Sequence, residues 1–302
     1  MALIAGPTAS GKSALALQLA VQSGSVIVNA DSAQIYRDLP ILSAAPSGAE
    51  RTRAEHRLYG VLDGGQPCSA ADWAEMASRE IAEIHQTGGL PIIVGGTGLY
   101  IRTLLDGIAP VPPIDATVRQ DVRSATTEEN HRRLAKLDPE AAGSLNPADT
   151  TRIARSLEVV LSTGKRLSEW QNERQGGIGE CIELAPMLLL PPRDWLYARC
   201  DERFEQMIQA GAAEEVEALL KRKLDPSFPV MRAIGVREIA ASLDGDLTRE
   251  EAVAAGQQAT RRYAKRQYTW FAHQPPQDWP RFREPIDPTT LDQALALLKS
   301  RD

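Results

Sequence analysis

The stretch "GPTASGKS", Gly6 to Ser13, matches the phosphate-loop pattern G-x-x-x-x-G-K-[ST] in full. It follows the short apolar segment "ALIA" and opens residues 12–24, whose composition favours a helix that stops at Gly24. Loop amides and a helix dipole both attract an anion in this context. We therefore expect Lys12 to contact phosphate and Ser13 to ligate Mg²⁺. The expected diphosphate or nucleotide site comprises Gly6, Pro7, Thr8, Ala9, Ser10, Gly11, Lys12 and Ser13.

The chain around this loop alternates between strand-like and helix-like segments. Residues 25–31 and 90–95 are apolar and strand-like, and residues 69–86 form an amphipathic pattern that begins at Ser69, a good N-cap. Such alternation predicts a P-loop NTPase-like α/β fold, with a parallel sheet flanked by helices. Ligands bind outside the carboxyl ends of such strands, where Asp31 and Thr97 both fall.

The strand and helix alternation stops at the proline-rich segment "GIAPVPPID". Residues 111–185 contain several short helical patterns and no convincing strand, so we expect an all-helical insertion domain there. Its last helix is expected to start at Asn146 or Asp149 and to stop at Gly164. Strand-like composition returns in "IELAPMLLLPP", and long helical segments follow. The expected catalytic core therefore comprises residues 1–110 and 186–302.

The composition of the 302 residues, 43% hydrophobic and 25% charged, is typical of a folded globular protein. A net charge of −6 argues against a uniformly basic surface, but it permits a local basic groove. Three cysteines without a C-x-x-C pair and four histidines without metal spacing argue against a disulfide framework or a zinc site. No basic leader or membrane-length apolar run is present, so a cytoplasmic protein is expected.

The acidic residue Asp31 stands out because the strand "PIIVGG" ends in glycines. Many ATPases place a magnesium-binding acid at the end of such a strand, and here Asp31 is the only early strand-end acid. Lys12, Ser13 and Asp31 together predict transfer chemistry on a phosphate-bearing substrate. They leave open which bond breaks, and Asp31 as a turn or cap residue remains an alternative.

The segment "RRYAKRQYTW", residues 261–270, interleaves four cations with three aromatic residues. Cations for phosphates and aromatic rings for bases are what an RNA-binding surface needs. From the residues alone we favour an amphipathic helix with buried aromatics and solvated charges. "TRIAR" and "RAIGVRE" carry further arginines, at one helix face and around a glycine-containing turn respectively.

Four stretches together resemble the tRNA dimethylallyltransferase family, also called tRNA isopentenyltransferases. They are "GPTASGKS", "NADSAQIY", "GGTGLYIRTLLDG" and "RRYAKRQYTWF", and the similarity continues in the family's order through "RLSEW", "LAP", "RFEQMIQAGAAEEVEALL" and "RAIGVRE". The resemblance implies transfer of a dimethylallyl group from dimethylallyl diphosphate to adenine N6, with Mg²⁺ assisting diphosphate departure. The target adenosine lies on the 3′ side of the anticodon in tRNAs that read codons beginning with U.

The resemblance also implies residue roles. Asp31 would accept the proton from the adenine amine, Thr97 would hydrogen-bond the substrate, and Lys12 and Arg203 would hold the diphosphate. The helical insertion would grip the anticodon stem-loop, and the protein is expected to be a monomer. The implied tRNA contacts are Asp31, Ser32, Ala33, Gln34, Thr97, Arg119, Thr151, Arg152, Ile153, Ala154, Arg155, Arg232, Ala233, Ile234, Gly235, Val236, Arg237, Lys265, Arg266, Gln267, Tyr268, Thr269 and Trp270.

Two other enzymes remain as alternatives. An adenylate isopentenyltransferase acting on free AMP or ATP would use the same loop and Asp31, but it would need neither the insertion nor residues 261–270. A P-loop small-molecule kinase would also use the loop. The chain departs from the family pattern at Glu55, which replaces a proline, and at Val236, which replaces an aromatic residue. "LSAAP" lacks a lysine that the family often has.

Overall fold

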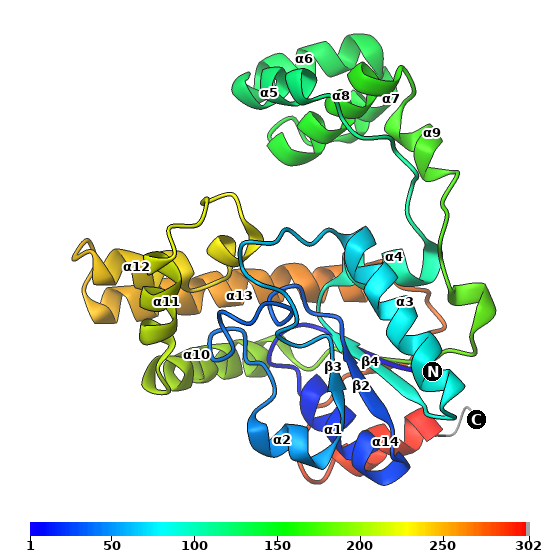
Figure 1. Cartoon of the computed structure of the whole chain (residues 1–302), viewed down its shortest axis with the longest axis vertical. Helices are drawn as coiled ribbons and strands as arrows, with labels where there is room; N and C mark the ends of the chain where they lie inside the picture. The colour runs from blue at the N-terminus through cyan, green and yellow to red at the C-terminus, as the bar shows by residue number, and fades with distance from the viewer. Residues whose placement is uncertain (300–302) are drawn as a thin grey trace. The chain divides into compact units, whose positions relative to one another are not determined.

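The structure, a computed structural model, describes residues 1–299 and divides the chain into two compact units (Figure 1). Met1–Leu104 and the chain from Gly179 onward form the large unit, and Leu105–Ile178 form the small unit. The small unit begins and ends earlier than the expected insertion, residues 111–185. Backbone pairing between Ile108 and Gln175 closes its base, and Ala185 already belongs to a strand of the large unit.

The large unit contains all six strands and most of the helices. Its strands are β1 (Ala2–Ala5), β2 (Val26–Asn29), β3 (His56–Arg57), β4 (Pro91–Gly95), β5 (Ala185–Leu189) and β6 (Arg281–Phe282). Its helices are α1 (Lys12–Ser23), α2 (Gly48–Arg53), α3 (Ala70–Gln86), α4 (Gly98–Asp106, whose last turn enters the small unit), α10 (Arg193–Gln209), α11 (Ala212–Lys221), α12 (Val236–Leu243), α13 (Arg249–His273) and α14 (Leu291–Lys299), with 3-10 turns η1 (Gly179–Cys181) and η2 (Pro229–Arg232).

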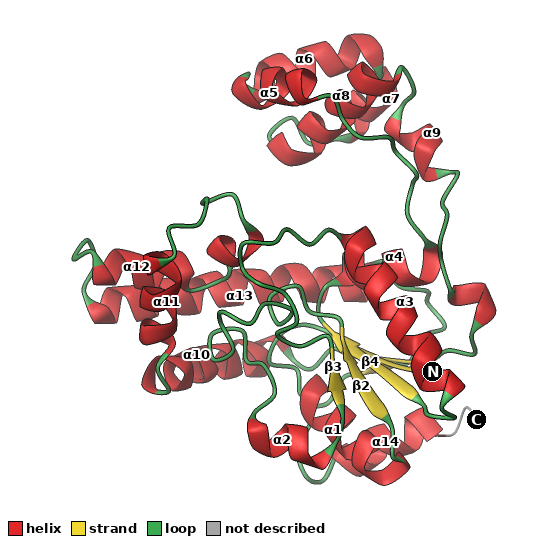
Figure 2. Cartoon of the chain, in the orientation of Figure 1, coloured by secondary structure: helices red, strands yellow, loops and turns green. Residues whose placement is uncertain are grey.

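The six strands form one parallel sheet in the order β3-β2-β4-β1-β5-β6, which confirms the predicted α/β class. β1 and β4 are buried along their whole length, because both faces of a parallel sheet are covered by helices. Figure 2 shows α1 and α14 on one side of the sheet and α3 on the other. Since β2, β4 and β1 are neighbours, Asp31, Thr97 and the phosphate loop emerge along the same edge of the sheet.

Several helix ends agree with the sequence. Gly24 ends α1 in the left-handed conformation with φ 65, and Ser69 begins α3 with a capping box. Asp149, rather than Asn146, caps the last long helix of the small unit through the amide of Arg152. Local capping chemistry therefore decides these boundaries.

α13 lies close to α10 and to the end of β4 because small residues permit the approach. A Cβ at Gly256 would clash with the Phe204 ring, and one at Gly98 would clash with the Trp270 indole. The packing brings the basic-aromatic segment of α13 alongside the carboxyl edge of the sheet. No helix in the described part of the chain is long and apolar enough to cross a membrane, and the cytoplasmic location stays a prediction.

The small unit is all-helical and has its own core. Its helices are α5 (Ala116–Ser124), α6 (Thr127–Leu137), α7 (Pro139–Ser144), α8 (Thr150–Thr163) and α9 (Leu167–Gln171). Val122, Leu134 and Leu157 meet at the centre of this core. The buried Asn130 amide joins α6 to α5 through a 2.7 Å bond to the Val122 carbonyl.

Candidate active site

The phosphate loop is wrapped tightly between β1 and α1. Gly6 and Gly11 have φ values of 156 and 95, and a Cβ at Gly6 would clash with the Leu189 carbonyl oxygen. Ala9, with φ 62, is a non-glycine residue in the left-handed region, where strain gathers at functional sites. Gly11 caps α1 without a side-chain acceptor, so the first amides of the helix remain available to an anion.

Two cations converge on this loop. Lys12 donates from Nζ to the Pro7 carbonyl at 2.6 Å, and the Arg203 guanidinium donates to the Thr8 hydroxyl. Burial lowers the pKa of Lys12 to about 8 and also lowers the pKa of Arg203. Within the described chain neither forms an ion pair with a carboxylate. The Asp31 carboxylate attracts both cations through space but bonds neither of them, so both remain available to an anionic ligand.

Gln267 of α13 holds the loop from the side. Its Oε1 accepts the Thr8 amide at 2.8 Å, and its Nε2 donates to the Gly96 carbonyl at 2.8 Å. The side chain is buried, 6% exposed, so its amide serves the loop. The Gln267 side chain therefore bonds within the protein through both of its polar atoms, and its contact with tRNA stays a prediction.

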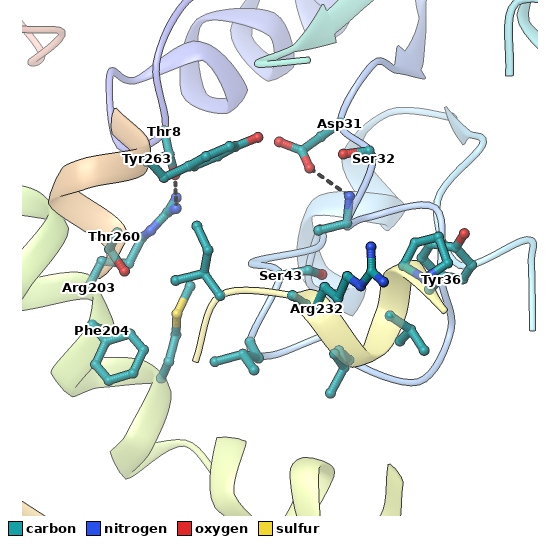
Figure 3. Close-up of a pocket in the computed structure, with 18 of the residues that line it drawn as sticks. Thr8, Asp31, Ser32, Tyr36, Ser43, Arg203, Phe204, Arg232, Thr260 and Tyr263 are labelled. Atoms are coloured by element: carbon teal, nitrogen blue, oxygen red, sulfur yellow. Dashed lines mark hydrogen bonds between the residues drawn. The ribbon is translucent and has the colours of Figure 1, made fainter. Parts of the chain in front are cut away.

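Asp31 is held just beyond β2 by neutral groups. The buried Asn29 side chain accepts the Asp31 amide at 2.8 Å and donates to the Asp31 carbonyl at 3.0 Å. Asp31 Oδ1 accepts the Ala33 amide at 2.9 Å, an arrangement that fixes the carboxylate. Figure 3 shows the Tyr263 hydroxyl directed toward this carboxylate.

Thr97, just beyond β4, completes the arrangement around the acid. Its hydroxyl accepts the Ser32 amide at 3.0 Å and donates to the Ser32 hydroxyl at 3.3 Å. Tyr263 lies against Thr97 as well, and burial raises the pKa of this tyrosine, so its hydroxyl keeps its proton. Thr97 and Tyr263 can thus orient a group that reaches Asp31. The sequence reasoning treated Tyr263 only as one aromatic of a basic segment.

A cavity of about 210 Å³ joins the acid to Arg203, one of the two cations (Figure 3). Asp31, Thr8 and Arg203 all line it. The wall also includes apolar side chains of α10 and of the loop after β2, among them Phe204 and Leu42. The space can therefore hold an anion beside Arg203 and an apolar group against Phe204 and Leu42.

The segment Arg232–Arg237 contributes to this cavity. Arg232, Ala233 and Ile234 line it, and Gln34 lies in the same loop as Asp31. Gly235 and Val236 are buried where α12 begins, whereas Arg237 is exposed. The structure thus places the first half of this predicted tRNA-binding segment at the cavity. The second half does not line it.

The predicted residues of α13 occupy different faces of the helix. Lys265, Arg266 and Thr269 are exposed, and they form a polar stripe available to a nucleic acid. Tyr268 is half-buried with Arg193 over its ring, and Trp270 is half-buried above Gly98. The half-buried aromatics and exposed charges fit the amphipathic-helix interpretation, and RNA contact by the exposed cations stays a prediction.

The predicted residues of the small unit also separate by exposure. Arg119, Thr151 and Arg152 are exposed, whereas Ile153 and Ala154 are buried in the small core. The buried side chains cannot touch RNA without opening that core.

Arg155 belongs to an arginine cluster on the small unit. Burial lowers the pKa of Arg155, with Glu158, Arg119 and Arg123 acting on it as nearby charges. Arg123 binds the buried Glu158 carboxylate at 2.6 Å. Arg123 belongs to this cluster but was not among the residues that the sequence indicated.

The Mg²⁺ expected at Ser13 is compatible with the donors present. Ser13 is exposed at the first turn of α1, beside the cationic loop. Among the described residues no group of three or more acidic, histidine or cysteine side chains could hold a metal. Mg²⁺ at Ser13 therefore stays a prediction.

The fold and the site define a class: a P-loop enzyme that performs group transfer from a phosphate-bearing substrate at the edge of a parallel sheet. The family model described as IPP transferase matches residues 34–274. The chain is 57% identical over 300 residues to a tRNA dimethylallyltransferase of Sphingopyxis alaskensis, with 99% of this chain and 98% of the relative covered. It is 61% identical over 274 residues to one of Novosphingobium aromaticivorans, with coverages of 90% and 98%.

Solved structures agree with this result. The full-length tRNA isopentenylpyrophosphate transferase of Bacillus halodurans is 29% identical, with a TM-score of 0.69 and coverages of 99% of this chain and 97% of that one. A eukaryotic dimethylallyltransferase acting on tRNA is 29% identical, with a TM-score of 0.77 and coverages of 89% and 69%. The chain belongs to the IPP transferase family.

Proposed function

We propose that this protein transfers the dimethylallyl group of dimethylallyl diphosphate to N6 of the adenosine on the 3′ side of the anticodon, in tRNAs that read codons beginning with U. Its relatives carry the name tRNA dimethylallyltransferase. The observation that carries the proposal is the cavity in which Arg203 and Asp31 face the same space. A prenyl diphosphate needs a cation such as Arg203, and an amine nucleophile needs a base such as Asp31.

The cationic side of the cavity serves the leaving group. As the allylic C–O bond breaks, its electron pair stays with the departing diphosphate, and negative charge develops on the bridging oxygen. Lys12, Arg203 and the amides of the phosphate loop are fixed before the reaction, so they stabilise this charge without reorganisation. Their lack of carboxylate partners keeps their charge available to the diphosphate.

The acidic side serves the nucleophile. The lone pair of adenine N6 is delocalised into the ring, so the amine attacks poorly unless its proton is removed as the new C–N bond forms. The Asp31 carboxylate accepts this proton, and the products are N6-(dimethylallyl)adenosine, diphosphate and one proton on Asp31. Thr97 and Tyr263 hold the surroundings of that carboxylate in place.

A magnesium ion is part of this proposal, with Ser13 as its protein ligand and diphosphate oxygens and waters as the others. When bound, such an ion would neutralise part of the charge on the leaving group. Removal of divalent cations by EDTA should therefore reduce turnover and weaken diphosphate binding. Restoration by Mg²⁺ and not by an equal ionic strength of Na⁺ is the expected control.

Recognition of tRNA would use two cationic surfaces. The exposed stripe of Lys265 and Arg266 on α13 can contact the phosphate backbone near the cavity. Arg119 and Arg152 of the small unit can contact the anticodon stem-loop. The target base sits in a single-stranded loop, so it can leave its stack at modest cost and enter the cavity.

The decisive experiment incubates the protein with dimethylallyl diphosphate, Mg²⁺ and unmodified tRNA, followed by nucleoside mass spectrometry. Prenylated adenosine beside the anticodon supports the proposal, and its absence refutes it. Parallel reactions with AMP and with ATP plus a small acceptor test the adenylate isopentenyltransferase and the kinase. The names of the relatives do not favour either alternative.

A further inference from the structure

One wall of the cavity is a compact turn, residues 40–44, in the loop after β2. The Ser43 amide donates to the Leu39 carbonyl at 2.9 Å, and the Ala44 amide donates to the Ile41 carbonyl at 2.9 Å. Ala44 then ends the turn in the left-handed conformation with φ 54. The turn presents Ser43 to the same cavity that contains Asp31.

The Ser43 hydroxyl has an unsatisfied hydrogen-bonding capacity. Its oxygen is shielded from solvent, and within the described chain it has no hydrogen-bond partner. Figure 3 shows Ser43 among the side chains that surround the cavity. A buried hydroxyl without a partner is unfavourable, so a ligand that supplies one gains affinity and specificity from it.

The position of Ser43 is fixed from two sides. The Gln34 amide donates to the Ser43 carbonyl at 3.0 Å and to the Ala44 carbonyl at 2.8 Å, which ties the turn to the segment that starts at Asp31. From α11, the Glu215 carboxylate accepts the Ile41 amide at 2.7 Å and the Leu42 amide at 3.0 Å. Glu215 therefore caps this turn from a different helix, as an N-cap side chain would.

We propose that the Ser43 side chain rotates toward the cavity and that its hydroxyl donates a hydrogen bond to a ring nitrogen of the adenine whose amine faces Asp31, with Glu215 as the positioning residue that holds the Ser43 backbone there. This rests on the proposed function. Adenine carries its amine donor beside ring nitrogens that only accept, so a carboxylate and a hydroxyl in one cavity complement two of its groups. A pocket that pairs polar groups of a base discriminates strongly against bases that lack them.

The test uses synthetic anticodon stem-loops with adenosine, 1-deazaadenosine, 3-deazaadenosine or 7-deazaadenosine at the target position. Ser43→Ala should lower kcat/KM on the adenosine stem-loop by on the order of tenfold, the value of one lost hydrogen bond. One of the three analogues should reduce the wild-type rate to a similar extent, and on that analogue Ser43→Ala should cause no further loss. Ser43→Thr, which keeps the hydroxyl, should retain most activity.

The result that overturns the proposal is wild-type behaviour of Ser43→Ala, or an equal loss on all three analogues. Failure of the wild-type protein to prenylate the adenosine stem-loop would instead refute the proposed function, so the two failures are distinguishable. Ser162→Ala in α8 is a matched control, because it removes another buried hydroxyl without a described partner but does not line this cavity.

The positioning role of Glu215 has its own readout. Glu215→Gln leaves one acceptor for two amides, so KM for the stem-loop should rise while KM for dimethylallyl diphosphate stays unchanged. Glu214→Gln, on the exposed neighbour, is the control. The double variant Ser43→Ala/Glu215→Gln should be little worse than Ser43→Ala alone. Fully multiplicative losses, or a Glu215→Gln enzyme that matches the control, would remove Glu215 from this role.

Discussion

One side of the site carries the cations Lys12 and Arg203, and the other carries the Asp31 carboxylate. The two sides also differ in the groups that hold their charges in place. The cations Lys12 and Arg203 donate to neutral oxygens of Pro7 and Thr8 and meet the Asp31 charge only through space, whereas the carboxylate of Asp31 accepts a backbone amide that fixes its direction. The cationic side thus depends on its ligand to balance its charge. The acidic side is already arranged by the protein, so it can act on a neutral amine.

The largest expected effect comes from breaking the acidic side. Asp31→Ala or Asp31→Asn should lower kcat by about 10²- to 10⁴-fold, the range for loss of a general base. Binding of tRNA, measured by filter binding, should change little, because most contacts lie elsewhere. Full activity of either variant would refute the role of Asp31 as the base.

Removing a cation should have a smaller kinetic effect and an unusual effect on stability. Arg203→Met should lower kcat/KM for dimethylallyl diphosphate by on the order of 10²-fold, as expected for a lost charge-stabilising donor. The melting temperature should stay level or rise, because the cost of burying Arg203 exceeds the attraction that it gains from Asp31, as the lowered pKa of Arg203 indicates. A clear loss of thermal stability would contradict the view that Arg203 is poorly compensated without its ligand.

The nucleic-acid surface should respond through salt rather than through chemistry. Changing Lys265 and Arg266 together to alanine should weaken tRNA binding several-fold and flatten the log Kd against log salt slope by about 1.4 to 1.8. Measurements with Arg79→Ala, an exposed charge on α3, provide the control. An unchanged slope would take both residues out of the interface.

The smallest expected effect is a pH dependence of diphosphate binding. Burial lowers the pKa of Lys12 to about 8, so in the free protein this side chain is charged below pH 8 and neutral above it. KM for dimethylallyl diphosphate should be flat below pH 8 and should rise above it. Lys12→Arg, whatever its basal KM, should not show that rise.

The same shift has a consequence for stability, with a defined sign. The folded pKa of Lys12 lies below its ordinary value of 10.5, so the unfolded chain binds more protons between about pH 8 and pH 10.5. The contribution of Lys12 to the free energy of unfolding should therefore increase as the pH rises through that window. Lys12→Met should remove this gain in urea titrations at the two pH limits.

Much of the fold could be predicted because its determinants are local. The octapeptide Gly6–Ser13 places a loop and a helix, Ser69 and Gly24 carry their own capping chemistry, and buried apolar runs predict the central strands. The edge strands β3 and β6 are two residues each and have no periodic pattern, so the sequence did not indicate them. The limits of the small unit depend on a backbone pairing, Ile108 with Gln175, between distant residues.

The sequence by itself determined the kinds of groups present: a phosphate loop, a strand-end acid, and a basic helix with aromatic residues. Only the tertiary structure decided their partners. It turned Gln267 inward to the loop, aimed Tyr263 at Asp31, and fixed the turn at Ser43 through Glu215. The physical reason is that each of these contacts joins elements distant in sequence, and hydrogen-bond geometry at about 3 Å is set by packing, which residue spacing does not encode.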